Sequence, residues 1–260
     1  MRTTVAKLSL MCVGLIFLSL IFTDLSSAKI DPETVAGVWF FDEGKGAVAK
    51  DSSKHGSNGK LVGNPKWVAG KVGQALEFNG KNHVDCGNPA SLDINVEALT
   101  ISAWINPKTI AGLDAIVEKE CGGSAGYNLY INGGFIHFRM FANANVAAQP
   151  AEKVKVNTWT HVCAVYDGKE QRIYYDGVLK STAKNSGEIT KNAVAPFAIG
   201  TAPKCPGRGF DGTIDDVVVF NVALDKDDIK TLMTKGLEDA LAVSSIAKLA
   251  TTWGRMKEYK

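Results

Sequence analysis

The chain has 260 residues, and 29 Lys and Arg against 27 Asp and Glu leave a formal net charge of +2. This near balance lacks the basic excess of proteins that bind the phosphate backbone, so no nucleic-acid partner is expected. Hydrophobic residues at 45% and charged residues at 22% exclude a mainly disordered chain, and the 26 Gly follow no triplet period, which excludes collagen.

The first 28 residues have the pattern of a secretory signal peptide. Arg2 and Lys7 supply a basic start, residues 8–22 form an apolar run, and Ser26 and Ala28 occupy the small-residue positions of a cleavage site. The run is too short for a comfortable membrane span, although an uncleaved anchor is the alternative. We therefore expect a secreted or extracytoplasmic protein, in the periplasm or at the cell surface, with no membrane span after cleavage.

Short segments rich in β-branched and aromatic residues follow one another through the rest of the chain. They predict strands at residues 35–41, 74–78, 100–105, 115–117, 127–131, 135–141, 160–166, 171–175, 197–199 and 214–220. The dipeptides that supply the positive φ angles of tight hairpins are Asn79-Gly80, Asn132-Gly133, Asp167-Gly168 and Asp176-Gly177. Many short strands with regular turn signals indicate an all-β antiparallel sandwich or barrel.

One short C-terminal helix is predicted after the last strand. Asp225 can cap its N-terminus, Ile229 and Leu232 belong to one apolar face, and Gly236 is a suitable end. Residues 237–260 are assigned to a C-terminal extension that ends in an exposed tail. Residues 29–236 then form a single domain, because no internal repeat or Pro/Ser-rich linker divides them.

Alternation within the predicted strands assigns side chains to faces. In the strand 214–220 it places Asp215 with Val217 on one face and Asp216 with Val218 on the other. Both faces are otherwise apolar, so at least one acid lies against buried surface and needs a hydrogen-bond partner, a counter-charge or a metal. The Trp residues expected in the core are Trp39, Trp104 and Trp159.

Eight short motifs stand in a characteristic order between about residues 35 and 236. They are GVWFFDEG at 37–44, DSSKHGSNG at 51–59, GQALEFNG at 73–80, LTISAWI at 99–105, WTHVCAVYDG at 159–168, IYYDG at 173–177, FDGTIDDV at 210–217 and NVAL at 221–224. In order and spacing they resemble the LamG-like jelly-roll family, within the laminin G, pentraxin and concanavalin A-like lectin superfamily. The resemblance implies two curved antiparallel sheets stacked about 10 Å apart in a jelly-roll β-sandwich.

Members of this superfamily bind sugars, sulfated glycans, steroids or proteins, and some are enzymes, so function has to be argued from a site. The glucanase motif Glu-x-Asp-x-x-Glu, which sets two carboxylates on one strand face, is missing, although Glu118 and Glu120 stand close together. The motifs of zinc peptidases, α/β-hydrolases, P-loop proteins and sialidases are missing too. We predict a non-catalytic protein. The alternative, a hydrolase with an unrecognised site, needs two carboxylates about 5–10 Å apart.

The segment 135–141 carries the predicted ligand-binding surface. Ile136, Phe138 and Met140 share the face expected in the core, while His137, Arg139 and Phe141 share the other. Aromatic faces beside hydrogen-bond donors are the mixture that a sugar-binding surface uses. The candidate site, on the concave sheet face and the rim loops, comprises His137, Arg139, Phe141 and Asn143. An ordinary solvated sheet face is the alternative.

Many relatives in the family hold a calcium ion with oxygen ligands from loops and strand ends. The candidate ligands here are Asp42, Asp51, Asn58 and Asp215. Calcium takes about six to eight oxygens, several of them from the backbone. The alternative is that Asp51 and Asn58 bond their own backbone in turns and that Asp215 caps neighbouring N–H groups.

Four Cys residues remain after signal cleavage, and an even count in an exported chain suggests disulfide bonds. Cys121 and Cys205 lie in Gly-rich loops, and relatives of this fold often have a disulfide in comparable rim loops, so these two are the predicted pair. Cys86 and Cys163 lie in strand-like segments and either form a second pair or remain as small buried apolar side chains.

Together these expectations describe a secreted, non-catalytic binding module for carbohydrate or glycoconjugate, with an optional structural calcium ion. Its partner would be a glycan or a cell-surface or extracellular protein. The second hypothesis is a protein-interaction or adhesion domain without affinity for sugars. A flat apolar rim patch would favour that hypothesis, whereas exposed aromatics beside amides and Arg favour sugar.

Overall fold

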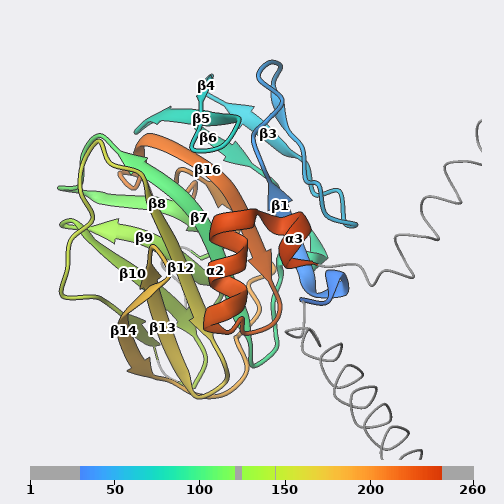
Figure 1. Cartoon of the computed structure of the whole chain (residues 1–260), viewed down its shortest axis with the longest axis vertical. Helices are drawn as coiled ribbons and strands as arrows, with labels where there is room; N and C mark the ends of the chain where they lie inside the picture. The colour runs from blue at the N-terminus through green and yellow to red at the C-terminus, as the bar shows by residue number, and fades with distance from the viewer. Residues whose placement is uncertain (1–29, 121–124, 144, 242–260) are drawn as a thin grey trace, which may run out of the picture.

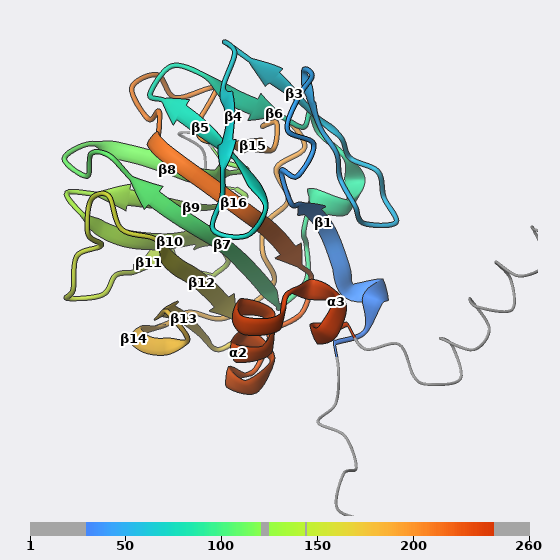
Figure 2. The same ribbon diagram turned by 45° about the horizontal axis from the view of Figure 1, so that its top comes forward.

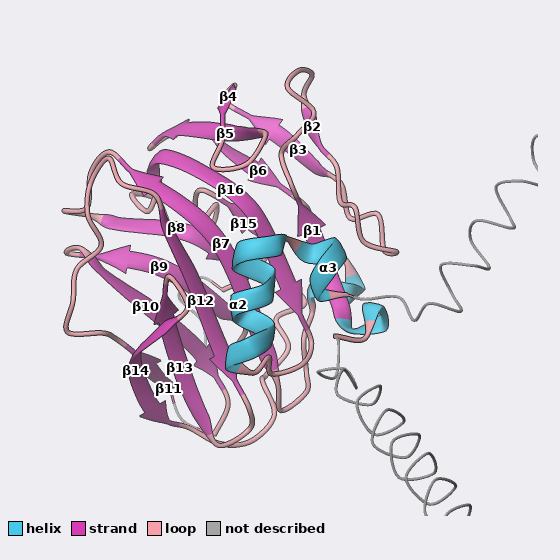
Figure 3. Ribbon diagram, viewed as in Figure 1, coloured by secondary structure: helices cyan, strands magenta, loops and turns pink. Residues whose placement is uncertain are grey.

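The computed structural model describes residues 30–120, 125–143 and 145–241. The predicted signal peptide lies outside these ranges. No helix within them is long and apolar enough to cross a membrane. The predicted fold class is confirmed, because two antiparallel sheets stack face to face and the helices gather at one side of them (Figures 1 and 3).

Sheet A carries the longest strands of the sandwich. Its strand order is β14-β13-β12-β7-β16-β5-β4, and β1 pairs with β16. The bounds are β1 Val35–Trp39, β4 Lys66–Ala69, β5 Gln74–Asn79, β7 Leu99–Pro107, β12 Thr160–Tyr166, β13 Glu170–Tyr175, β14 Val178–Lys184 and β16 Asp211–Phe220. Strands β4 and β14 are additional to those predicted, because their half-exposed positions interrupt the apolar pattern.

Sheet B has the order β11-β10-β9-β8-β15-β6-β3-β2. The bounds are β2 Val48–Ala49, β3 Gly59–Val62, β6 His83–Asp85, β8 Leu113–Glu118, β9 Tyr127–Asn132, β10 Phe135–Phe141, β11 Asn145–Ala148 and β15 Ala198–Ile199. Figure 2 shows β8, β9 and β10 side by side behind the strands of sheet A. Strands β2, β3, β6 and β11 are additional to the predicted ones, and each has four residues or fewer.

The main core fills the space between the sheets. Both sheets send every second side chain into it, among them Leu76, Ile101, Ile214, Leu129, Ile136 and Phe138. Trp39 is fully buried there and stacks on Phe197, with ring centroids 5.1 Å apart. Trp104 does not lie in this core, because Ala103 and Ile105 on either side of it face inward. Trp159 precedes β12 and is half-buried.

Helix α2, Lys226–Lys235, begins and ends as predicted. The Asp225 carboxylate accepts hydrogen bonds from the backbone N–H groups of Asp227 and Asp228, each at 2.8 Å. Gly236 at φ 83° follows the last turn. The Asp225 carboxylate satisfies N–H donors that a helix start leaves open, and Gly236 allows the backbone to leave the helix.

Helix α2 packs on the outer face of sheet A and forms a second core with it. Ile229 and Leu232 of the helix join Val165 of β12 and Phe220 of β16 in this cluster. One further helix, α3, Leu237–Ala240, follows α2 directly and buries two more side chains in the same cluster. The predicted single helix is therefore two. Two 3-10 turns, η1 Pro32–Thr34 and η2 Ala90–Leu92, complete the helical elements of the described ranges.

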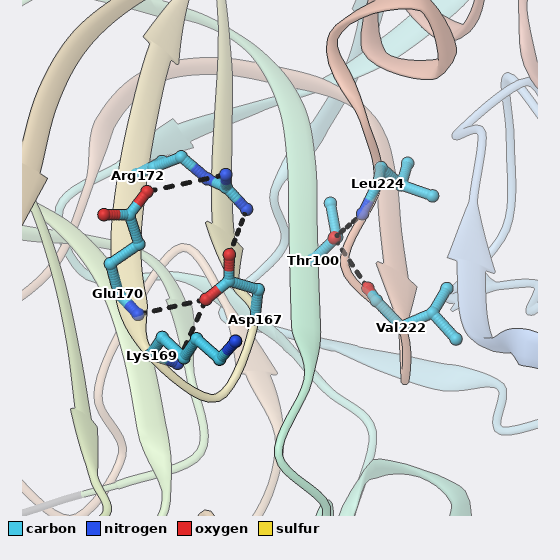
Figure 4. Close-up of polar contacts among 7 residues, drawn as sticks. All are labelled: Thr100, Asp167, Lys169, Glu170, Arg172, Val222 and Leu224. Carbon is cyan, nitrogen blue, oxygen red and sulfur yellow. Dashed lines mark hydrogen bonds and ion pairs between the residues drawn. The ribbon is translucent and has the colours of Figure 1, made fainter. Parts of the chain in front are cut away.

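Two side-chain clusters lie at the same end of sheet A (Figure 4). At the β12–β13 hairpin the Asp167 carboxylate accepts from the backbone of Lys169 and Glu170 and from Arg172 Nη2 at 2.7 Å. On β7, Thr100 Oγ1 donates to Val222 O and accepts from Leu224 N. The Thr100 contacts hold the link between β16 and α2 against the sheet.

Three of the four predicted hairpin turns join adjacent antiparallel strands, at residues 132–133, 167–168 and 176–177. The prediction for Asn79-Gly80 is wrong, because this turn leads from β5 in sheet A to β6 in sheet B. Gly80 has φ 77°, so the dipeptide does supply the expected positive φ angle.

The predicted alternation along β16 is also wrong at one point. The register with β7 shifts between Asp215 and Val218, and Asp216 has φ 48°. The extra residue is a β-bulge. Asp215 therefore stands opposite Trp104 on the outer face, whereas Val217 points into the main core.

Candidate functional site

The outer face of sheet B carries a polar cluster across β8, β9 and β10. Cross-strand register places Glu118 beside Asn128 and Asn128 beside Arg139, and it places Tyr130 beside His137. Directly paired residues share a face of the sheet. This sheet B cluster comprises Glu118, Glu120, Asn128, Tyr130, His137, Arg139, Phe141 and Arg208.

Two buried carboxylates form the base of the sheet B cluster. Glu118 and Glu120 are each 1% exposed, and both accept hydrogen bonds from Asn128 Nδ2, at 3.2 and 2.8 Å. Burial raises the pKa of the Glu118 carboxyl to about 8, and the neighbouring Glu120 charge adds to the rise. Glu118 is therefore mostly protonated at neutral pH, which lowers the charge that the sheet has to bury.

Two guanidinium groups lie above the acids. Arg139 pairs with Glu120 at 3.6 Å and Arg208 pairs with Glu118 at 3.8 Å. The two Arg side chains are 22% and 21% exposed. Arg139 is ion-paired with Glu120, whereas Arg208 lies against the mostly protonated Glu118 carboxyl. Both contacts hold a planar group with several N–H donors at the surface, in an orientation that the buried layer determines.

Aromatic rings surround the Arg139 guanidinium. It lies 4.7 Å from the centre of the Phe141 ring, and Tyr130 stacks on His137 with ring centroids 5.0 Å apart. Burial lowers the pKa of His137, which favours the neutral imidazole. His137 and Phe141 are buried, at 9% and 6% exposure, so the partly exposed Tyr130 ring and the Arg139 guanidinium form the accessible part of this group. A flat ring beside a fixed group of donors is a combination that a sugar ring can use.

The structure brings three of the four predicted ligand-binding residues together. His137, Arg139 and Phe141 belong to the sheet B cluster. Asn143 is exposed in the next loop, where its backbone N–H donates to Ser186 O and its side chain contacts Ser186 Oγ at 3.4 Å. The sequence interpretation missed Tyr130, Asn128 and Arg208, and it considered the two Glu residues only as an incomplete catalytic motif.

The predicted calcium ligands fall into two pairs. Asn58 Oδ1 accepts from the backbone N–H of Asp51, and the Asp51 carboxylate accepts from the N–H groups of Val38, Ser53 and Ser57. These contacts match the turn role that was the alternative interpretation.

Asp42 and Asp215 form the second pair, near the loop of residues 70–73. Asp42 accepts from Gln74 N, and its charge contributes to raising the pKa of the fully buried Asp215 to about 6, although burial is the main cause. Within the described ranges, no group of three or more His, Cys, Asp and Glu side chains is arranged to hold a metal ion. Calcium binding stays a prediction.

The two cysteine predictions have different outcomes. Cys121 lies outside the described residues, so its bond with Cys205 stays a prediction. Cys86 and Cys163 are both free and buried, so the second pair is wrong. Cys86 belongs to the main core, whereas Cys163 faces α2 in the second core, and sheet A separates the two. The alternative, small buried apolar side chains, is confirmed.

Comparisons with known proteins agree on the fold. A family model described as "Concanavalin A-like lectin/glucanases superfamily" matches residues 78–230. A search of curated protein sequences gives no match.

Among solved structures, domain 4 of an extracellular arabinanase from Geobacillus stearothermophilus, in complex with arabinotriose, superposes with a TM-score of 0.61 at 18% identity. The match covers 77% of this chain and 98% of that domain.

Two toxin binding domains are similar as well. The binding domain of Paraclostridial mosquitocidal protein 1 gives a TM-score of 0.64 at 16% identity, covering 78% of this chain and 52% of that one. The binding domain of botulinum neurotoxin DC, in complex with rat synaptotagmin II, gives 0.61 at 17% identity, covering 79% and 52%. The chain thus spans about half the length of these toxin domains.

Proposed function

Since this chain belongs to the concanavalin A-like lectin/glucanases superfamily, we propose that it is a secreted, non-catalytic binding module that recognises carbohydrate or glycoconjugate through the sheet B cluster. The resemblance found in the sequence is confirmed, but membership alone leaves the ligand open. The observation that carries the proposal is the stacked Tyr130–His137 pair beside Arg139, whose guanidinium is held by a buried carboxylate.

The similar structures support this choice of ligand class. The arabinanase domain is solved with arabinotriose, and a botulinum neurotoxin type C depends on two ganglioside molecules for cell entry. Both share the fold of this chain at 18% identity or less, so they support binding and do not identify the sugar. The sugar-contacting residues have to come from this chain.

The two Glu residues of the cluster are better placed to position the arginines and Asn128 than to act as catalytic groups. A retaining or inverting hydrolase needs carboxylates that touch the sugar. Glu118 and Glu120 converge on one amide, but each is 1% exposed and paired with an arginine. We therefore expect the protein to bind oligosaccharides without releasing reducing sugar from them.

The test is a glycan-array screen followed by calorimetric titration of the glycans that bind. Arg139→Gln should weaken binding about ten-fold or more, because it removes a fixed donor at the centre of the site. Arg172→Gln is the matched control, since Arg172 is also ion-paired and is 24% exposed on sheet A. Repeating the titrations with EDTA and with calcium chloride tests the optional calcium ion.

Equal loss in both variants, or in neither, would place the sugar site elsewhere on the molecule. If no glycan binds at all, the protein-interaction hypothesis becomes the better one. A specific surface favours that candidate: Val178 and Leu179, which follow the β13–β14 turn, are 56% and 48% exposed. An apolar rim of this kind suits a protein partner.

A further inference from the structure

A cavity lies on the opposite side of the sandwich from the sheet B cluster. It has a volume of about 340 Å³ and lies between the outer face of sheet A and the helices α2 and α3, partly open to solvent. Trp104 and Val218 line it from the sheet, and Leu232 and Leu237 line it from the helices. The volume and the mostly apolar lining fit a small organic molecule.

A buried hydrogen-bonding pair also lines this cavity. Ser102 Oγ and His161 Nε2 are 2.8 Å apart, and the Trp104 ring meets the His161 ring edge-on at 5.1 Å. His161 is 2% exposed, and its Nδ1 has no hydrogen-bond partner among the described residues. A polar nitrogen that is buried without a partner is costly, and such atoms mark sites that a ligand completes.

Charged groups of both signs surround the cavity. Asp42, Asp216, Glu238 and Lys235 line it, and Lys71 adds a second ammonium over the Trp104 ring. Burial raises the pKa of Asp216 to about 7, so this acid is about half ionised at neutral pH. The acids therefore suit a ligand that brings a positive charge in place of the Lys71 ammonium.

A cation of this chain already lies over the ring of Trp104, which lines the cavity. The ammonium group of Lys71 lies 4.5 Å from the centre of the Trp104 ring. The loop of Lys71 is held by Asp215, which accepts from the backbone N–H groups of Lys71 and Val72 at 2.8 and 3.2 Å. Gly70 packs so closely that a Cβ atom there would lie 2.5 Å from the Asp215 carboxylate. The backbone that carries the lysine is therefore held in place, next to the Trp104 ring.

We propose that this cavity binds a primary alkylammonium ligand whose charged end takes the place of the Lys71 ammonium on Trp104, while its chain lies among the apolar side chains of α2 and α3. Aromatic faces attract ammonium groups, and the surrounding carboxylates strengthen the attraction. Lys71 then acts as a tethered competitor that the ligand has to displace. The site is independent of the proposed sugar site and lies on the other sheet.

The test is calorimetric titration of the full chain with n-hexylammonium chloride in EDTA, with 1-hexanol as the uncharged probe. Hexylammonium should bind more tightly than hexanol. Lys71→Ala should strengthen hexylammonium binding about two- to five-fold, because the competing ammonium is removed from the ring. Asp216→Asn should weaken it by a similar factor, and Asn tolerates the positive φ angle at this position.

Lys153→Ala is the matched control, since Lys153 makes the same kind of contact with Phe135, at 5.0 Å, on sheet B. It should leave hexylammonium affinity unchanged. The proposal is overturned if hexanol binds as tightly as hexylammonium, if neither probe binds, or if Lys71→Ala and Lys153→Ala behave alike. Glycan binding is measured separately, so failure of the amine site leaves the proposed function standing.

Discussion

Sheet A and sheet B each turn one face to the main core, and their other faces differ. The outer face of sheet A is covered by α2. The side chains that face the helix are therefore buried, among them Val165, Cys163 and Phe220. The outer face of sheet B has no described α-helix over it and carries instead a layer of carboxylates capped by arginines. The outer face of sheet A is thus buried by apolar side chains under α2. The outer face of sheet B instead buries acidic side chains that contact arginines.

This difference shows how a sandwich can separate stability from recognition. Apolar burial under α2 contributes free energy in proportion to the area removed from water. Buried ion pairs contribute little net stability, because desolvation offsets their attraction, but they fix the orientation of the groups involved. We therefore expect substitutions under α2 to change stability most, and substitutions in the sheet B cluster to change ligand binding and pH dependence.

The largest effect should come from the second core. Leu224 precedes the N-cap of α2 and is 3% exposed, in the same cluster as Ile229. Leu224→Ala should lower the free energy of unfolding by about 2–4 kcal/mol, through lost burial and the cavity left behind. Leu113→Ala, on β8 at 37% exposure, is the control and should cost no more than about 0.5 kcal/mol. Equal costs in denaturant unfolding would contradict the contrast between the faces.

A second effect should appear as a pH dependence that belongs to sheet B. The pKa of Glu118 is about 8 in the folded state, well above its ordinary value of about 4.3 in the unfolded chain. Between these pH values the folded state holds a proton that the unfolded state has released. The contribution of Glu118 to the free energy of unfolding is therefore fully present below about pH 4 and is lost as pH rises toward 8. Midway between these pH values the slope should be about 1.4 kcal/mol per pH unit.

Glu118→Gln isolates this contribution from that of Asp114, Asp215 and Asp216, whose pKa values burial also raises. The variant should flatten the decline in unfolding free energy between pH 5 and pH 8, measured by urea denaturation. The exposed Glu188→Gln is the control and should leave the decline as it is. An unchanged slope in Glu118→Gln would mean that the carboxyl is ionised in the folded protein.

Part of the sheet B cluster could have been predicted from one hairpin. Residues 132–135 close the turn between β9 and β10, so counting back along both strands pairs Tyr130 with His137 and Asn128 with Arg139. Glu118 cannot be placed by such counting, because the register between β8 and β9 shifts between Ala115 and Val117. Arg208 reaches the cluster from a loop that belongs to neither strand.

The fold itself was predictable where local patterns and packing agree. The strands of the main core alternate, and the cap of α2 is explicit in its acids. Alternation failed at Asp216, where a bulge inserts one residue, and at Trp104, which is apolar but lines the cavity between sheet A and α2. Alternation identifies the two faces of a strand, but tertiary packing decides which apolar face meets the other sheet and which meets a helix.

The smallest of these effects concerns the link that places α2 on sheet A. Thr100→Val keeps the shape of the side chain and removes the hydroxyl that donates to Val222 O at 2.7 Å and accepts from Leu224 N at 3.0 Å. The cost should be about 1–2 kcal/mol, because two backbone groups lose their partner. Thr182→Val on β14 is the control, since Thr182 is exposed and should change stability by less than about 0.5 kcal/mol.

Hydrogen exchange should show faster opening of the α2 amides in Thr100→Val alone, while glycan binding on sheet B stays unchanged. If glycan affinity fell with it, the two outer faces would be coupled through β7 and would no longer act as separate regions.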